Sequence, residues 1–215
     1  VSSGTDALLI SLMSIGIKAG DEIITSPFTF ISTVETIISL GAVPVLVDID
    51  KDTFNIDADK ISLSITNKTK AILPVSIFGQ SADLKKINIL AKKYNLQIIE
   101  DAAQSFGSKH YDKFSLDYVN ISCTSFFPTK SLGCYGDGGA IFTNSNKIAN
   151  LCSKLRLHGK SKKDFEYLGV AGRLDTFQAI ILLEKLKLFK TEIKKRKKIT
   201  NYYNDRIDKI NLKIK

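Results

Sequence analysis

The sequence has few of the residues that build disulfide frameworks or zinc sites, and it lacks long apolar runs. Its 215 residues include three cysteines and two histidines. Cys123, Cys134 and Cys152 show neither paired nor metal-ligand spacing, so we expect free thiols in a reducing cytoplasm and no metal site. No run of 18 or more apolar residues occurs, which argues against a membrane-spanning helix. The chain starts without Met and without a basic-then-apolar signal peptide, so we expect a piece of a longer protein.

The net charge of +9 is concentrated near the C-terminus. Residues 185–198 hold eight lysines and arginines against one glutamate. Leu186, Phe189, Ile193 and Ile199 recur there at intervals typical of an amphipathic helix, with the basic residues on its solvated face. A basic segment of this kind also suits nucleic acid, and that alternative stays open from composition alone. We expect no nucleic-acid partner.

Short apolar runs alternate with longer helical stretches along the chain, which indicates an α/β fold with a mainly parallel sheet. We expect a mixed sheet of about seven strands, flanked by helices, within a large domain over residues 1–175. A long helical segment over 176–215 should lead toward a smaller C-terminal domain that lies outside this sequence. Strands are expected at 22–24, 43–47, 71–75 and 140–143, with two more leading to Asp101 and Ser125. Helices are expected at 5–17, 33–40, 57–65, 82–94, 147–157 and from 174 almost to 215.

Two predicted strands end in residues with useful chemistry. Asp101 follows one apolar run, with Gln104 close behind it, and Ser125 ends the other, with Lys130 close behind it. The carboxyl ends of parallel strands meet at one edge of a sheet, where α/β proteins bind ligands. An aspartate there also serves as a helix cap, and most lysines only solubilise a surface. A lysine among aromatic residues at a strand exit, however, suits reaction with an aldehyde.

The start of the chain offers a candidate anion site. Gly4 and Thr5 open a predicted helix, whose N-terminal N–H groups and dipole attract phosphate. Plain helix capping would look the same. Phe30 could stack on a flat ring or belong to the core. Together these features supply partners for a phosphate, a pyridine nitrogen and an aldehyde, the three groups of pyridoxal phosphate.

The order and spacing of these segments resemble the DegT/DnrJ/EryC1/StrS family. Its members are pyridoxal phosphate-dependent nucleotide-sugar aminotransferases with the fold-type-I architecture, and the resemblance covers nearly the whole chain. The matching segments are residues 2–8, 25–30, 44–50, 101–107, 125–130 and 136–140.

The resemblance implies a role for each candidate residue. Lys130 would bind the cofactor aldehyde covalently and shuttle a proton, and Asp101 would pair with the pyridine nitrogen. The other implied contacts are Gln104 at the ring, Phe30 stacked on it, and Gly4, Thr5 and Ser125 at the phosphate.

The resemblance also implies the reaction. Glutamate would donate its amino group to the cofactor, which would then aminate a keto-sugar nucleotide for surface polysaccharide, lipopolysaccharide O-antigen or another glycan. Residues 132–139 are similar to members that act on 3-oxo UDP- or dTDP-sugars, including the UDP-2-acetamido-3-oxo-glucuronate type. Family members are cytoplasmic homodimers with shared active sites.

One departure concerns the contact with the partner subunit. Arg173 and Gln178 match a family pattern, but Ala171 stands where an Asn that reaches the neighbour's phosphate is expected. Arg173 and His158 are candidates for the substrate or dimer-partner site. Family dehydratases carry His in place of the lysine, so Lys130 argues against dehydration. A regulatory, sensory or catalytically silent member that binds the cofactor remains the alternative.

Overall fold

The computed structural model describes residues 1–162 and 164–209. Within these residues six strands form one sheet in the order β2-β1-β3-β4-β5-β6. The first five strands run parallel, and β6 is antiparallel to β5. The predicted mixed, mostly parallel sheet is therefore confirmed, with six strands described. They are β1 Glu22–Thr25, β2 Val43–Leu46, β3 Thr69–Ile72, β4 Gln97–Asp101, β5 Ile121–Ser125 and β6 Gly139–Phe142.

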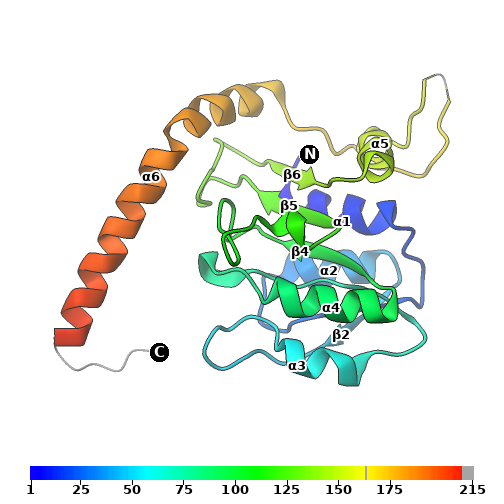
Figure 1. The fold of residues 1–215 in the computed structure, drawn as a ribbon. Coiled ribbons are helices and arrows are strands. Elements are labelled where there is room, and N and C mark those ends of the chain that lie inside the picture. Colours follow the sequence, from blue (N-terminus) through cyan, green and yellow to red (C-terminus); the bar gives the residue numbers. More distant parts are fainter. Residues whose placement is uncertain (163, 210–215) are drawn as a thin grey trace.

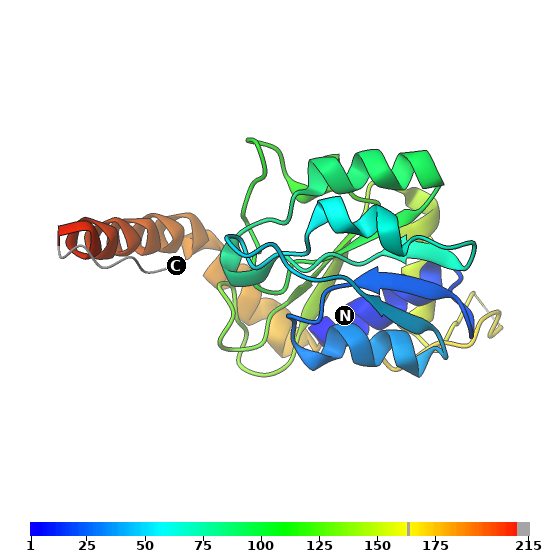
Figure 2. The ribbon, with the colours of Figure 1, turned by 90° about the horizontal axis from the view of Figure 1, so that it is seen from below.

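Helices cover both faces of the sheet. Figure 2 shows α1 and α2 on one face and α3 and α4 on the other. α5 packs beside α1 at the β6 end of the sheet, and α6 leaves the body (Figure 1). The helices are α1 Gly4–Ser14, α2 Ile31–Ser39, α3 Ala58–Ile61, α4 Leu84–Tyr94, α5 Asn146–Leu155 and α6 Thr176–Lys209.

The core has two layers because successive strand residues face opposite sides of the sheet. Ile23 and Ile24 are adjacent and both fully buried, yet they belong to different clusters. Ile23 packs with Leu8 and Leu12 of α1, whereas Ile24 packs with Leu84 of α4 and its neighbours. Burial on both faces explains why these strands are apolar runs rather than alternating patterns.

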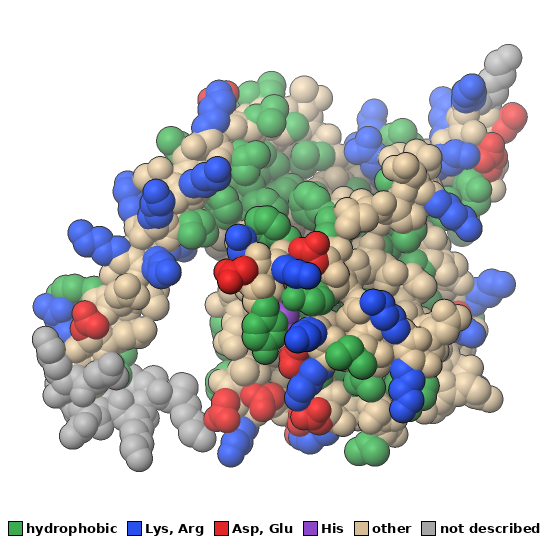
Figure 3. Space-filling model, viewed as in Figure 1, with side chains coloured by type: hydrophobic (Ala, Val, Ile, Leu, Met, Phe, Trp, Pro, Cys, Tyr) green, Lys and Arg blue, Asp and Glu red, His purple; other side chains and the backbone are tan. Residues whose placement is uncertain are grey.

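The first half of the long helix α6 packs against the body. Leu182 and Phe189 are buried against Phe126 and the segment that follows it. Further along, the helix extends away from the sheet (Figure 1), and lysine and arginine side chains line it (Figure 3). Within the described residues, no helix combines the length and apolar character that crossing a membrane requires.

The predicted apolar stripe on this helix is only partly buried. Phe189 is buried, but Leu186 is 47% exposed and Ile199 is 56% exposed. The expected helix over 185–199 is present as part of α6, and its apolar residues are partly exposed because α6 diverges from the sheet before the stripe ends. The helix begins at Thr176, and the division into a 1–175 domain and a 176–215 segment stays a prediction.

Candidate active site

A cavity of about 400 Å³ opens at the carboxyl ends of β4 and β5. Asp101 ends β4 and Ser125 ends β5, and the parallel pairing of the two strands brings their ends to the same edge. The first turns of α1 and α2 also reach this edge. The cavity is lined by all seven residues expected to contact the cofactor: Gly4, Thr5, Phe30, Asp101, Gln104, Ser125 and Lys130.

Asp101 forms the buried floor of the cavity. Its Oδ2 accepts a hydrogen bond from Thr33 Oγ1 at 2.8 Å, and its Oδ1 accepts one from the Ala103 N–H at 3.1 Å. Burial raises the pKa of Asp101, and this effect is opposed by the two hydrogen bonds and by the positive charge of Lys130. A cation placed against this carboxylate would relieve the penalty of burying its charge.

The N-terminus of α1 forms another part of the cavity wall. Ser3 caps the helix, because its Oγ accepts from the Asp6 N–H at 3.0 Å. The N–H groups of Gly4 and Thr5 belong to the first turn, where no carbonyl of the same helix can accept them. The Asp6 carboxylate accepts from Ser2 Oγ and does not line the cavity. The helix therefore presents free donors and the positive end of its dipole to an anion.

Gly4 allows this close approach. A Cβ at Gly4 would meet the Ser125 Cβ at 2.7 Å, so any larger residue would push the helix away from β5. Beside it, Thr5 Oγ1 donates to Ser32 Oγ at 3.0 Å and ties α1 to α2. The anion wall is thus held by contacts between three elements.

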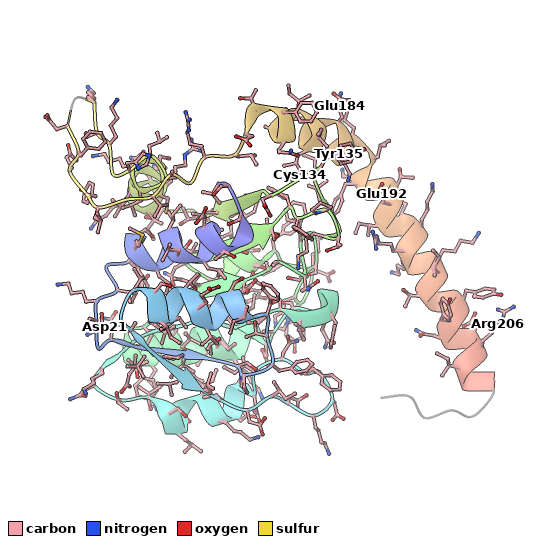
Figure 4. All side chains as sticks on the ribbon, turned by 180° about the vertical axis from the view of Figure 1, so that it is seen from behind. Asp21, Cys134, Tyr135, Glu184, Glu192 and Arg206 are labelled. Atoms are coloured by element: carbon pink, nitrogen blue, oxygen red, sulfur yellow. The ribbon has the colours of Figure 1, made fainter. Side chains whose placement is uncertain are left out.

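Lys130 lies in the turn after β5, where its N–H donates to the Phe127 carbonyl at 2.9 Å. The chain that follows is fastened to α6. The Tyr135 N–H donates to Gln178 Oε1 at 2.8 Å, and Figure 4 shows Cys134 and Tyr135 beside the first half of that helix. The lysine therefore stands on a loop that is anchored at both ends.

Cys123 is a buried neighbour of Asp101 at the cavity wall. Its Sγ lies 3.1 Å from Ser11 Oγ and 3.4 Å from the Ala7 carbonyl oxygen. Burial raises the pKa of the Cys123 thiol far above its usual value. This thiol remains protonated, so it is no nucleophile at this site.

Two expected residues lie elsewhere. His158 sits in the turn after α5, where its N–H donates to the Val170 carbonyl at 3.0 Å, and Arg173 precedes α6. Both side chains are exposed, and neither lines the cavity. Their contact with a substrate or a partner subunit stays a prediction. Phe30 does line the cavity, but it is 72% exposed and stands at the rim, so its stacking also stays a prediction.

Sequence reasoning missed several residues of the site. Thr29 and Ser32 line it from the chain that enters α2, and Asp137 lines it from the loop after Lys130. Thr33 stands behind the wall and contacts Asp101 across 68 positions of sequence. A Thr-x-x-x-Thr spacing at 29 and 33 was the available signal, and by itself it indicates only one face of a helix.

The cavity fits pyridoxal phosphate on three observations. Free N–H groups at a helix start suit the phosphate, the buried Asp101 carboxylate suits a protonated ring nitrogen, and Lys130 supplies an amine for the aldehyde. The cavity is also lined mainly by small residues, which leaves room for a flat ring.

Curated relatives share most of this chain. It is 50% identical over 204 residues to the UDP-2-acetamido-2-deoxy-3-oxo-D-glucuronate aminotransferase of Pseudomonas aeruginosa, covering 94% of this chain and 57% of the relative. It is 47% identical over 184 residues to a pleiotropic regulatory protein of Geobacillus stearothermophilus, and the match covers 85% of this chain and 50% of the relative. The chain thus spans about half the length of the curated relatives it matches.

Solved structures share the fold. A DegT DnrJ EryC1 StrS aminotransferase from Brucella abortus matches with a TM-score of 0.93 and 39% identity, covering 97% of this chain and 58% of that one. NtdA from Bacillus subtilis, solved with bound cofactor PMP, matches with a TM-score of 0.82 and 38% identity, covering 87% and 43%.

The family model of these aminotransferases matches residues 1–215, in agreement with the resemblance seen in the sequence. On the motifs, the fold and this match, the chain belongs to the DegT/DnrJ/EryC1/StrS aminotransferase family.

Proposed function

We propose that the protein containing this chain is a pyridoxal phosphate-dependent aminotransferase that acts on keto-sugar nucleotides. The observation that carries the proposal is the convergence of Lys130, Asp101 and the α1 N-terminus on one cavity of about 400 Å³. Family membership supports the same activity.

Each candidate residue of this chain has a separate role in the proposed reaction. The N–H groups of Gly4 and Thr5, with the Ser125 hydroxyl, hold the phosphate. The Asp101 carboxylate holds a proton on the pyridine nitrogen, and Lys130 binds the aldehyde carbon and later moves a proton at the substrate carbon. When bound, the cofactor supplies an electron sink for the bond that breaks.

Two observations support a proposal for the substrate, one from a relative and one from the sequence. Half of the aligned residues are shared with an enzyme named for a 3-oxo UDP-sugar, and residues 132–139 resemble that type. We propose a 3-oxo UDP- or dTDP-sugar as acceptor and glutamate as amino donor. We propose that the reaction takes place in the cytoplasm. Its product would be used to build surface polysaccharide, O-antigen or another glycan.

A homodimer with shared active sites is part of the proposal. Phe30 and Phe78 are 72% and 71% exposed, and Phe30 stands at the cavity rim. Large exposed aromatic residues beside a cavity suit a surface that a second copy covers. Arg173 and His158 lie outside the cavity of one chain, and we propose that they act at this shared boundary or on the substrate.

The test uses full-length protein loaded with pyridoxal phosphate. Borohydride reduction followed by peptide mass spectrometry should find the cofactor on Lys130. Glutamate should convert the wild-type cofactor to its amino form, and Lys130→Ala should slow that step by about 10²- to 10⁴-fold because proton transfer is lost. Attachment at another lysine would overturn the assignment of Lys130.

The acceptor is tested on the same protein. Its amino-form cofactor is mixed with 3-oxo and 4-oxo UDP-sugars, and release of the aminated sugar is followed by mass spectrometry. Amination of the 3-oxo sugar is expected, whereas amination of the 4-oxo sugar alone would reject the assignment.

A regulatory role is the second candidate, because one relative at 47% identity is named a pleiotropic regulatory protein. Such a protein would bind the cofactor without turnover. The glutamate step separates the two candidates: binding on Lys130 with no conversion by glutamate would favour regulation.

A further inference from the structure

Among the residues that the structure describes, Thr33 is the side chain that donates a hydrogen bond to the Asp101 carboxylate. Thr33 lies in the first turn of α2 and is fully buried. Its Oγ1 donates to Asp101 Oδ2 at 2.8 Å, while the Ala103 N–H holds Oδ1 at 3.1 Å. One bond on each oxygen fixes both the position of the carboxyl group and the orientation of its plane.

A second threonine fixes the first. Thr29 Oγ1 lies 2.7 Å from Thr33 Oγ1. An ionised carboxylate only accepts, so the Thr33 proton points to Asp101 and the Thr29 hydroxyl must donate to Thr33. Thr29 lines the cavity, so this chain of hydroxyls runs from the cavity wall to the back of the carboxylate. Each bond in such a chain strengthens the next through polarisation.

The contact also affects charge. Burial raises the pKa of Asp101, and the Thr33 hydrogen bond is among the interactions that lower it again. The titratable groups that face Asp101 are Lys130, in the turn after β5, and Cys123, on β5. Because the Cys123 thiol stays protonated, Lys130 is the charged group among them.

We propose that Thr33 is a positioning residue that holds the Asp101 carboxylate ionised and aimed at the ring nitrogen. The part of this inference that concerns the ring nitrogen rests on the proposed function. The contact between Thr33 and Asp101 is seen in the structure and does not depend on that function. Thr33 acts through Asp101 and does not line the cavity itself. Loss of the Thr33 hydroxyl should therefore change the protonation of Asp101 and of the ring nitrogen more than it changes the affinity for cofactor or substrate.

The chain offers a matched control. Thr36 lies on the same helix and is also buried, but its hydroxyl donates only to the backbone carbonyls of Ser32 and Thr33. Thr33→Val and Thr36→Val remove the same atom from the same helix. Thr33→Ser keeps the hydroxyl and should restore the wild-type behaviour.

The first measurement uses the full-length protein without cofactor. Carboxyl carbons of aspartate are labelled with ¹³C, the Asp101 signal is identified with Asp101→Asn, and its titration is followed by NMR. Thr33→Val should raise the midpoint by about one pH unit, because a hydrogen bond to a charged group is lost. Thr33→Ser and Thr36→Val should leave it unchanged. An unchanged midpoint in Thr33→Val would overturn the proposal.

The second measurement follows conversion of the cofactor by glutamate. Thr33→Val should lower the kcat of this conversion by about tenfold or more, and it should change the KM for glutamate little. A wild-type rate in Thr33→Val would overturn the positioning role. Failure of the wild type to bind cofactor would instead reject the proposed function, and the first measurement would still report whether Thr33 controls Asp101.

Discussion

Burial of the Asp101 carboxyl sets stability against function at one residue. Its pKa is raised in the folded chain, so over the range between the ordinary and the raised value the folded state binds more protons than the unfolded state. The free energy of unfolding therefore falls as the pH rises through that range. Without a bound cation, the protein is less stable at neutral pH than it would be with a neutral group in this place.

Asp101→Asn should accordingly stabilise the cofactor-free protein. The gain in melting temperature over wild type should be larger at pH 8 than at pH 4.5, because the wild-type carboxyl is more fully ionised at pH 8. The same variant should lose most of its glutamate reaction. Differential scanning calorimetry at the two pH values measures the first effect.

Asp137→Asn serves as the control, since it removes a carboxyl from the exposed side of the same cavity. Its change in melting temperature gives the effect of losing an exposed carboxyl, and the effect of Asp101→Asn is compared with it. Equal destabilisation by Asp101→Asn at both pH values would contradict the account.

Single site residues could be predicted from the sequence where their immediate neighbours in sequence marked them. Asp101, Ser125 and Lys130 follow apolar strands, and the strand ends meet in space as expected. Thr33 carried no such signal, because its partner is set by how α2 packs on the sheet rather than by neighbours in sequence. Arg173 was proposed from a family pattern and His158 as a tentative contact, and nothing local indicated on which side of the molecule either would lie.

Among the elements, α1 depends on one residue without a side chain. Its start lies against the end of β5 because Gly4 leaves no Cβ to collide with Ser125. A displaced helix would carry the phosphate donors with it, since they belong to its first turn.

Gly4→Ala should therefore weaken cofactor binding while leaving the helix itself intact. The clash should cost about 1–3 kcal/mol, and if this appears in binding the affinity for pyridoxal phosphate falls by about 5- to 150-fold. Equilibrium dialysis measures the affinity, and the far-ultraviolet circular dichroism should stay the same. Ser14→Ala, at the other end of α1, should bind the cofactor normally; equal weakening in both would point to general damage.

The element boundaries show where sequence patterns run out. The strand expected at 71–75 ends at Ile72, and Pro74 follows, which has no N–H to continue the ladder. The helix expected at 57–65 divides into α3 and a 3-10 turn at 62–64. The antiparallel direction of β6 could not be read from its residues, because apolar runs look alike in either direction. The end of the last helix was expected close to 215, and residues 210–215 lie outside the described part.

For the attraction of polyanions by the whole molecule, the distribution of the positive charge matters more than the net charge. The basic residues of 185–198 lie on α6, much of which extends away from the sheet (Figures 1 and 3). A helix that projects with charge around it attracts polyanions without reading their sequence.

The full-length protein should bind DNA only as a generic polycation. Its affinity should show no preference between sequences, and for six to ten phosphate contacts it should fall by about 10³- to 10⁵-fold between 50 and 200 mM salt. Fluorescence anisotropy with two unrelated duplexes measures both properties. Tight, sequence-dependent binding at 200 mM salt would revive the nucleic-acid alternative.

The walls of the cavity come from distant parts of the chain, from Ser3 at one end to Asp137 at the other. On a ribosome, chains emerge at about 5–20 residues per second and fold as units. A nascent chain that has not yet exposed Asp137 lacks one wall, however well its first strands have paired. The pocket that we propose for pyridoxal phosphate is therefore incomplete until the segment that carries Asp137 has left the exit tunnel.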